Sequence, residues 1–239
     1  MMKISDDLIN NDVPAVSQLK VNDCVSFCIT GNSDLKIAFL GNSITRHGRA
    51  ANIGWYGDWG MAASSKENDY VHKFVDRLNK DRRKVSYCVA NLSEWECSRN
   101  DGLFDERYSA VKRFCADVII VRLGENARLH DSVDGFAPHY ENLINYFADA
   151  NAKIILTDLF WEYEPFDTYV KNLADSRGYA FAQIHDLGSD GRMKAVGLFE
   201  HQGVALHPND KGMQEIADRI YKAMCLALSY QKNNMKLKF

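Results

Sequence analysis

Short apolar segments that favour β-strands alternate with amphipathic helical patterns along most of this chain, and this alternation restricts the fold more than any other feature. The clearest strand is predicted at residues 116–124, ADVIIVRLG, where an apolar run ends in an arginine, a leucine and a glycine. Strands are also predicted at residues 24–30, 35–43, 84–91, 152–160 and 179–187. Helices are predicted at residues 66–80, 103–115, 138–150, 166–177 and 209–230.

Strands joined by helical crossovers form parallel sheets that helices cover on both faces. The order of elements therefore predicts an α/β fold with three α/β/α layers. Its sheet is expected to be doubly wound, mainly parallel and five-stranded (flavodoxin-like), with an extra N-terminal strand. Residues 1–34 are expected to be an N-terminal extension that carries this strand, and residues 35–239 the main domain. In the added strand Val25, Phe27 and Ile29 alternate with other residues, which predicts a half-buried strand.

The composition excludes several classes of protein and partner. Hydrophobic residues make up 46% and charged residues 26% of the 239 positions, which excludes disordered and fibrous chains. A net charge of −3 gives no electrostatic reason to expect a nucleic-acid partner or a polybasic membrane contact. The longest apolar run, 223–228, is too short to span a membrane, and residues 1–16 lack the pattern of a signal peptide. A cytoplasmic protein is therefore expected, with its oligomeric state open.

The six cysteines do not indicate a disulfide scaffold or a zinc site. Cys24 and Cys28 form one close pair, but no second pair completes a set of metal ligands. Most of the six are expected to be reduced and buried. No histidine-based metal motif and no dinucleotide or phosphate loop is present, so neither a metal nor a cofactor is expected.

Three polar motifs follow predicted strands or precede the last predicted helix. In doubly wound folds, sites lie at the carboxyl ends of the strands. Ser43, in Gly41-Asn42-Ser43, is a candidate nucleophile whose surrounding N–H groups could hold an oxyanion, or else a helix cap without chemistry. Asn126 could donate to an oxyanion or simply cap a turn. His207 could act as a general base or lie at the surface near a capped helix, whose start Asp210 would support.

Together these motifs resemble the SGNH (GDSL-like) hydrolase family of esterases and acylhydrolases. The resemblance rests on IAFLGNSIT at 37–45, with Asn42 where the family usually has Asp, on Gly124-Glu125-Asn126, and on HPNDKG at 207–212. It covers about residues 35 to 230 and implies a carboxylic-ester hydrolase with Ser43 as nucleophile, His207 as base and Asn126 as oxyanion donor. The implied substrate is a small-molecule or carbohydrate ester, with deacetylation of a carbohydrate as one candidate reaction.

Two departures from the family bear on activity. The family's acid stands three residues before the histidine, where this chain has Val204. Glu96, Glu200 or a backbone carbonyl in the segment 200–206 are the candidates to orient His207 instead. The family's second oxyanion donor, a glycine N–H, falls near Glu96; that N–H could still donate, and the carboxylate is expected to be solvated rather than in the site.

An aromatic loop follows the candidate nucleophile. Residues 53–61, IGWYGDWGM, contain two tryptophans and a tyrosine among three glycines. They could form a platform for a sugar ring or an acyl chain, to which Trp161 and Tyr163 would add, or the loop could be packed down by its own tryptophans. Two other classes remain open: a non-catalytic binding protein on the SGNH fold, and, less supported, a nucleotide-binding domain.

Overall fold

The computed structural model describes residues 24–129 and 132–236. Most of the predicted extension, residues 1–23, lies outside the described residues, and so does the segment in which no signal peptide was expected. No helix in the described ranges is long and apolar enough to cross a membrane.

A six-stranded sheet forms the centre of the molecule, in the order β1-β3-β2-β4-β5-β6. All neighbouring strands are parallel except β1, which pairs antiparallel to β3 at the edge. The strands are β1 Val25–Cys28, β2 Leu35–Gly41, β3 Val85–Asn91, β4 Val118–Arg122, β5 Lys153–Thr157 and β6 Ala180–Ala182. The predicted fold class is therefore confirmed, including the five-stranded parallel core and the added strand.

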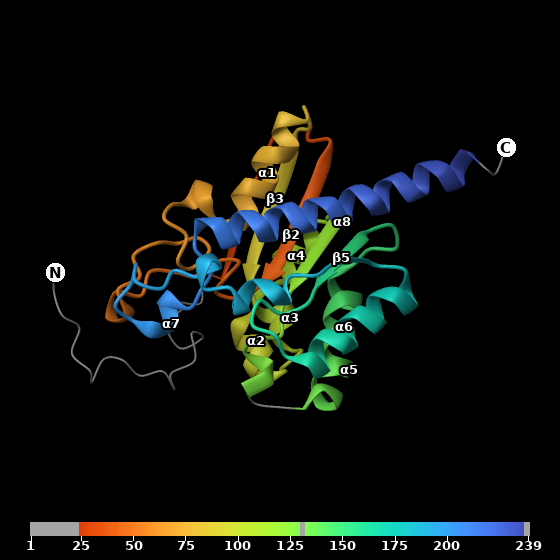
Figure 1. Cartoon of the computed structure of the whole chain (residues 1–239). Helices are drawn as coiled ribbons and strands as arrows, with labels where there is room; N and C mark the ends of the chain where they lie inside the picture. The colour runs from red at the N-terminus through yellow and green to blue at the C-terminus, as the bar shows by residue number, and fades with distance from the viewer. Residues whose placement is uncertain (1–23, 130–131, 237–239) are drawn as a thin grey trace.

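Helices cover both faces of the sheet (Figure 1). The α-helices are α1 Tyr70–Lys80, α2 Ser93–Ser98, α3 Leu103–Arg107, α4 Ser109–Arg113, α5 Val133–Phe147, α6 Glu164–Arg177, α7 Gln202–Ala205 and α8 Asp210–Lys236. Helices α1 and α8 pack on one face against Ile37 and Phe39 of β2. Helices α2 to α6 pack on the other face, where Ala38 and Leu40 point. Because successive side chains of β2 point to opposite faces of the sheet, this strand contributes to the hydrophobic core on each face.

Side-chain caps explain where two elements differ from the predicted ranges. Helix α1 begins at Tyr70 rather than at residue 66, because the Asp69 carboxylate accepts the N–H of His72 at 2.8 Å and caps the helix there. Strand β6 ends at Ala182 rather than at residue 187. The carboxylate of Asp158 binds the N–H groups of Ile184 and His185, which turns the chain into a 3-10 segment.

Other elements also differ from prediction. The predicted helix at 103–115 is two short helices, α3 and α4, separated at Tyr108, and the sequence pattern did not predict α2 or α7. Strand β1 is less buried than expected, since Phe27 is 44% and Ile29, just beyond the strand, 67% exposed. The expectation that most cysteines are buried is wrong. All six are free, Cys24 and Cys88 are buried, Cys97 is half-buried, and the other three are exposed.

Candidate active site

Ser43 and His207 meet at the carboxyl edge of the sheet. Ser43 lies two residues beyond β2, and His207 lies in the connection between α7 and α8. Oγ of Ser43 is 2.8 Å from Nε2 of His207, although 164 positions separate the two residues. Ser43 is buried, with 8% of its surface exposed. This is the geometry in which a histidine can take the proton of a serine hydroxyl.

The other ring nitrogen of His207 is bound by a backbone carbonyl. Nδ1 of His207 lies 2.6 Å from the oxygen of Gly203, which belongs to α7. Because a carbonyl oxygen can only accept, Nδ1 carries the proton and the lone pair of Nε2 faces Ser43. The acceptor thus comes from the segment 200–206 that was one of the candidates. Of the two carboxylate candidates, Glu200 is exposed and Glu96 is bound elsewhere in the site.

Burial keeps the imidazole of His207 neutral. It lowers the pKa of His207 to about 3, more than the carbonyl of Gly203 raises it. The ring of Trp161 lies edge-on against the imidazole, with 5.3 Å between ring centroids. The carbonyl of Gly203 therefore selects the tautomer, and Trp161 restricts the orientation of the ring.

A buried ion pair lies next to Asn42, the residue before Ser43. Arg122, at the end of β4, is fully buried, and its Nη1 donates to Oε1 of Glu125 at 2.5 Å. Asn42 joins the pair: its Oδ1 accepts from Nη2 of Arg122, and its Nδ2 donates to Oε2 of Glu125 at 2.7 Å. Burial alone would raise the pKa of Glu125, but the charge and hydrogen bonds of Arg122 lower it, so Glu125 stays ionised.

Glu96 is also buried in this network, so the expectation that it is solvated is wrong. Its side chain is 0% exposed and accepts from three N–H groups of the turn after β4. Its own backbone N–H donates to the carbonyl of Leu92 at 2.8 Å, within the first turn of α2. Because this N–H is bound within helix α2, it is not available as the second oxyanion donor that the family resemblance suggested.

Asn126 is linked to the residue before Ser43 by a short chain of contacts. Nδ2 of Asn126 donates to Oε2 of Glu96 at 2.7 Å, and Glu96 lies 3.3 Å from Nδ2 of Asn42, the residue before Ser43. Among the described residues, no acceptor binds the backbone N–H of Ser43. This N–H and the second hydrogen of Asn126 Nδ2 are therefore the candidate donors for an oxyanion.

Asn209 and Asp210 act in structure rather than in chemistry. Oδ1 of Asn209 accepts the N–H groups of Lys211 and Gly212 at 3.0 Å each and caps α8. The Asp210 carboxylate instead binds Ser64, through its backbone N–H at 2.8 Å and its hydroxyl at 2.6 Å. Together these contacts fix the start of α8 and hence the position of His207.

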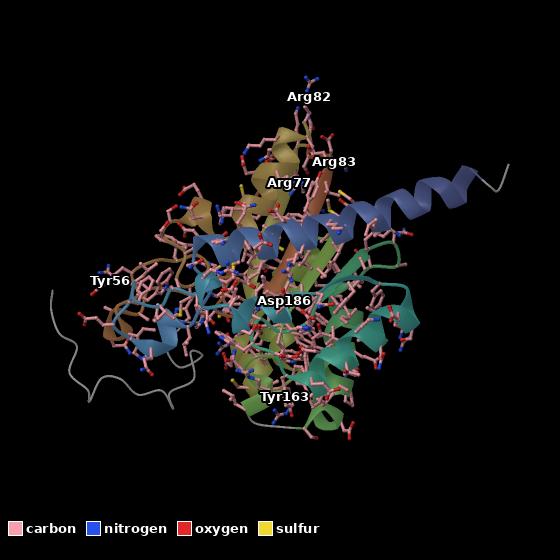
Figure 2. The ribbon with its side chains drawn as sticks, viewed as in Figure 1. Tyr56, Arg77, Arg82, Arg83, Tyr163 and Asp186 are labelled. Carbon is pink, nitrogen blue, oxygen red and sulfur yellow. The ribbon has the colours of Figure 1, made fainter. Side chains whose placement is uncertain are left out.

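The aromatic loop does not form one wall with Trp161 and Tyr163. Trp55 is 2% exposed and packs edge-on against Trp59, with ring centroids 5.6 Å apart. Tyr56 is 64% exposed at the outer tip of the loop, and Figure 2 shows it far from Tyr163. The loop is therefore packed down by its own tryptophans, whereas Trp161 lies against His207.

The sequence pattern predicts a solvated Glu96 and indicates no role for Arg122 or Glu125, whereas all three side chains are buried in the structure. Arg122 did carry a signal, because a charged residue at the end of an otherwise apolar strand must find a partner when the strand is buried. Its partners are Glu125, three residues further along, and Asn42 after β2, and a single sequence does not show that Asn42 joins them. Within the described ranges, no group of three or more His, Cys, Asp or Glu residues is arranged to hold a metal ion.

Comparison with solved structures supports the fold assignment. A candidate GDSL-like lipase from Parabacteroides merdae is 17% identical, with a TM-score of 0.55 over 83% of this chain and 99% of that one. An active-site mutant of a family two carbohydrate esterase from Clostridium thermocellum is 16% identical, with a TM-score of 0.57 over 84% of this chain and 66% of that one. A candidate GDSL-like lipase from Bacteroides uniformis is 16% identical, with a TM-score of 0.53 over 80% of this chain and 96% of that one.

These similarities define the class of fold. The chain has the three-layer fold of the GDSL-like (SGNH) hydrolases, as its motifs predicted. No family model matches the sequence, and no curated protein matches it either. At such low identity the likeness establishes the fold, and the activity has to be argued from the site.

Proposed function

We propose that this protein is a serine ester hydrolase in which Ser43 is the nucleophile and His207 is the general base. The observation that carries the proposal is the 2.8 Å contact between Oγ of Ser43 and Nε2 of His207, with Nδ1 bound to Gly203. The low pKa of His207 keeps Nε2 unprotonated at neutral pH, so its lone pair is free to form the hydrogen bond with the hydroxyl of Ser43.

The reaction follows from this geometry. His207 takes the hydroxyl proton as Oγ of Ser43 attacks the ester carbonyl. The oxyanion is held by the N–H of Ser43 and by Nδ2 of Asn126. Collapse of the tetrahedral species expels the alcohol, which takes the proton back from His207. Water, deprotonated by the same ring, then attacks the acyl-enzyme and releases the acid.

The proposed substrate class is an ester of a carbohydrate or another small molecule. This proposal is supported by the printed descriptions of similar folds, which include a family two carbohydrate esterase and a two-domain esterase active on acetylated mannans. The half-buried Trp161 beside His207 offers an apolar surface at the reacting centre. The alternative, a binding protein without activity, is favoured by the absence of an acid at position 204.

The decisive experiment compares the wild type with Ser43→Ala on p-nitrophenyl acetate. Loss of a covalent nucleophile should lower kcat by on the order of a thousandfold or more, while the melting temperature stays nearly unchanged. Ser189→Ala, which alters an exposed serine of another loop, is the matched control and should keep full activity. Wild-type activity in Ser43→Ala would refute the catalytic assignment, and an inactive wild type would favour the binding protein.

We also infer the location and the division of the chain. The six free cysteines, of which Cys28, Cys115 and Cys225 are exposed, support a reducing compartment such as the cytoplasm. The edge position of β1, antiparallel to β3, supports residues 1–34 as an extension of a domain that spans 35–239. Cell fractionation would test the first inference.

A further inference from the structure

We propose that Glu96 is a positioning residue, which holds the carboxamide of Asn126 in the orientation that donates to the oxyanion. The inference rests on the proposed ester hydrolysis. Glu96 stands about where the resembling family has a glycine whose N–H donates directly, and here that N–H is bound to Leu92. The side chain of Glu96 thus supports the donor Asn126, although the backbone N–H of Glu96 itself cannot reach an oxyanion.

One carboxylate holds the turn after β4 at three points. Oε1 of Glu96 accepts the backbone N–H of Gly124 at 2.5 Å and that of Asn126 at 3.2 Å. Oε2 accepts from Nδ2 of Asn126 at 2.7 Å. All of these partners are donors, so the ionised carboxylate satisfies them and a protonated one would not. The backbone and the side chain of Asn126 are therefore fixed by the same group.

The contact with Oε2 also selects which end of the carboxamide faces Glu96. A rotation of the amide by half a turn would place Oδ1 of Asn126 against the carboxylate, where two acceptors repel each other. With Nδ2 held, one of its two hydrogens is bound to Glu96 and the other is left for the substrate. Because an oxyanion donor helps only when it is aimed beforehand, this restraint acts on kcat.

A purely electrostatic view predicts the opposite effect. Glu96 and Glu125 are both buried, and Arg122 is the cation paired with Glu125 in this network. A negative charge near a developing oxyanion raises the energy of the transition state. If Glu96 acted only through its charge, its replacement by glutamine would raise kcat. If it positions Asn126, the same replacement lowers kcat, so the sign of the change separates the two.

The first test is Glu96→Gln on p-nitrophenyl acetate. Glutamine keeps the shape, but its NH2 group would meet Nδ2 of Asn126 donor to donor, which turns the Asn126 amide away. We expect kcat to fall by roughly ten- to a hundredfold, a part of the loss from deleting an oxyanion donor, while KM changes little. Glu94→Gln, on the same helix and paired with the half-buried Arg107, should leave kcat within about twofold of wild type.

A double-mutant cycle shows whether Glu96 acts through Asn126. In the Asn126→Ala background, Glu96→Gln should change kcat by less than about twofold, because no carboxamide is left to position. Equal losses in both backgrounds would assign Glu96 a merely structural role and overturn the inference, as would a rise of kcat in the single variant.

A measurement without activity keeps this inference separate from the proposed function and does not require any Glu96 variant to fold. In a nitrogen–proton correlation spectrum of the wild type, the Asn126 side-chain NH2 signals are identified by their loss in Asn126→Ala. One of the two protons should be shifted downfield and protected from exchange by its bond to Glu96. Two exchanging, unshifted protons would overturn the inference even if Ser43 proves to be the nucleophile. If the Asn126 proton is shifted and protected but the protein has no esterase activity, only the proposed function is refuted.

Discussion

The carbonyl oxygen of Gly203 lies 2.6 Å from Nδ1 of His207 and takes the place that a carboxylate has in a Ser-His-Asp triad. A carbonyl fixes the tautomer as well as a carboxylate does. It carries no full charge, so it stabilises the imidazolium of the transition state less. In the proposed mechanism, Ser43 and His207 are therefore oriented as in a triad but have a weaker electrostatic partner.

Restoring the acid at position 204 should not restore a triad. Val204 is fully buried in an apolar cluster with Trp55, Met61 and Ala195. In Val204→Asp the carboxylate would be buried there without a partner, which we expect to cost several kcal/mol of unfolding free energy. Urea unfolding at pH 7 measures this cost, and kcat on p-nitrophenyl acetate should not rise. A stable variant with higher kcat would show that the side chain can reach His207.

Asn126→Ala should lower kcat by roughly a hundred- to a thousandfold and change KM much less, because the bond to the oxyanion forms mainly in the transition state. It should also cost about 1–3 kcal/mol of stability, since Oε2 of Glu96 loses its closest donor in a buried site. Steady-state kinetics well below the melting temperature separate the two effects. A higher KM at unchanged kcat would identify Asn126 as a substrate-binding residue.

The network also explains why this chain has asparagine at position 42, where the family usually has aspartate. Nδ2 of Asn42 donates to Glu125 at 2.7 Å, and Glu96 lies 3.3 Å from the same nitrogen. Asn42→Asp would add a third carboxylate to a network in which Arg122 is already paired with Glu125, so the repulsion should exceed the added attraction and cost about 2–4 kcal/mol at pH 7.

A lower pH should reduce the loss of unfolding free energy caused by Asn42→Asp. The new carboxyl would have a raised pKa in the folded state, so the folded protein would bind the additional proton and gain stability as the pH falls from 7 to 5. Unfolding at the two pH values, relative to wild type, checks the sign. Asn172→Asp, at an exposed position of α6, should show neither effect. A pH-independent loss would rule out charge repulsion as its cause.

The pH profile of kcat/KM should show the titration of Glu96 separately from that of His207. Burial first, and then the charge of Glu125, raise the pKa of Glu96 to about 7. As the pH falls through this value, Glu96 takes up a proton, loses an acceptor and releases Asn126, so the wild-type profile should decline near pH 7.

In Glu96→Gln this decline should disappear. The remaining acid limb belongs to His207, whose pKa burial lowers to about 3, so it should lie below pH 5. Normalised profiles of the two proteins from pH 4 to 9 test both statements. Acid limbs near pH 6.5 in both would mean that His207 titrates as an ordinary histidine.

Much of the fold could be predicted from the sequence, because strand and helix patterns are local. The short run of β-branched residues that ends at Arg122 favours a strand, and the alternation of such runs with helical patterns predicts a doubly wound sheet. Ser43, Asn126 and His207 could be singled out for the same reason. Each lies in a short motif at an edge of the sheet that the order of elements already defined.

What only the tertiary structure decided is the partnership of groups that are distant in sequence. The bond from His207 to Gly203 depends on the short helix α7, which has too few residues to show a periodic pattern. The burial of Glu96 depends on α2 and on donors after β4, so its carboxylate and theirs are brought together only by folding. Local patterns determine elements and motifs, whereas hydrogen-bond partners and pKa values follow from burial and from charges supplied by other segments.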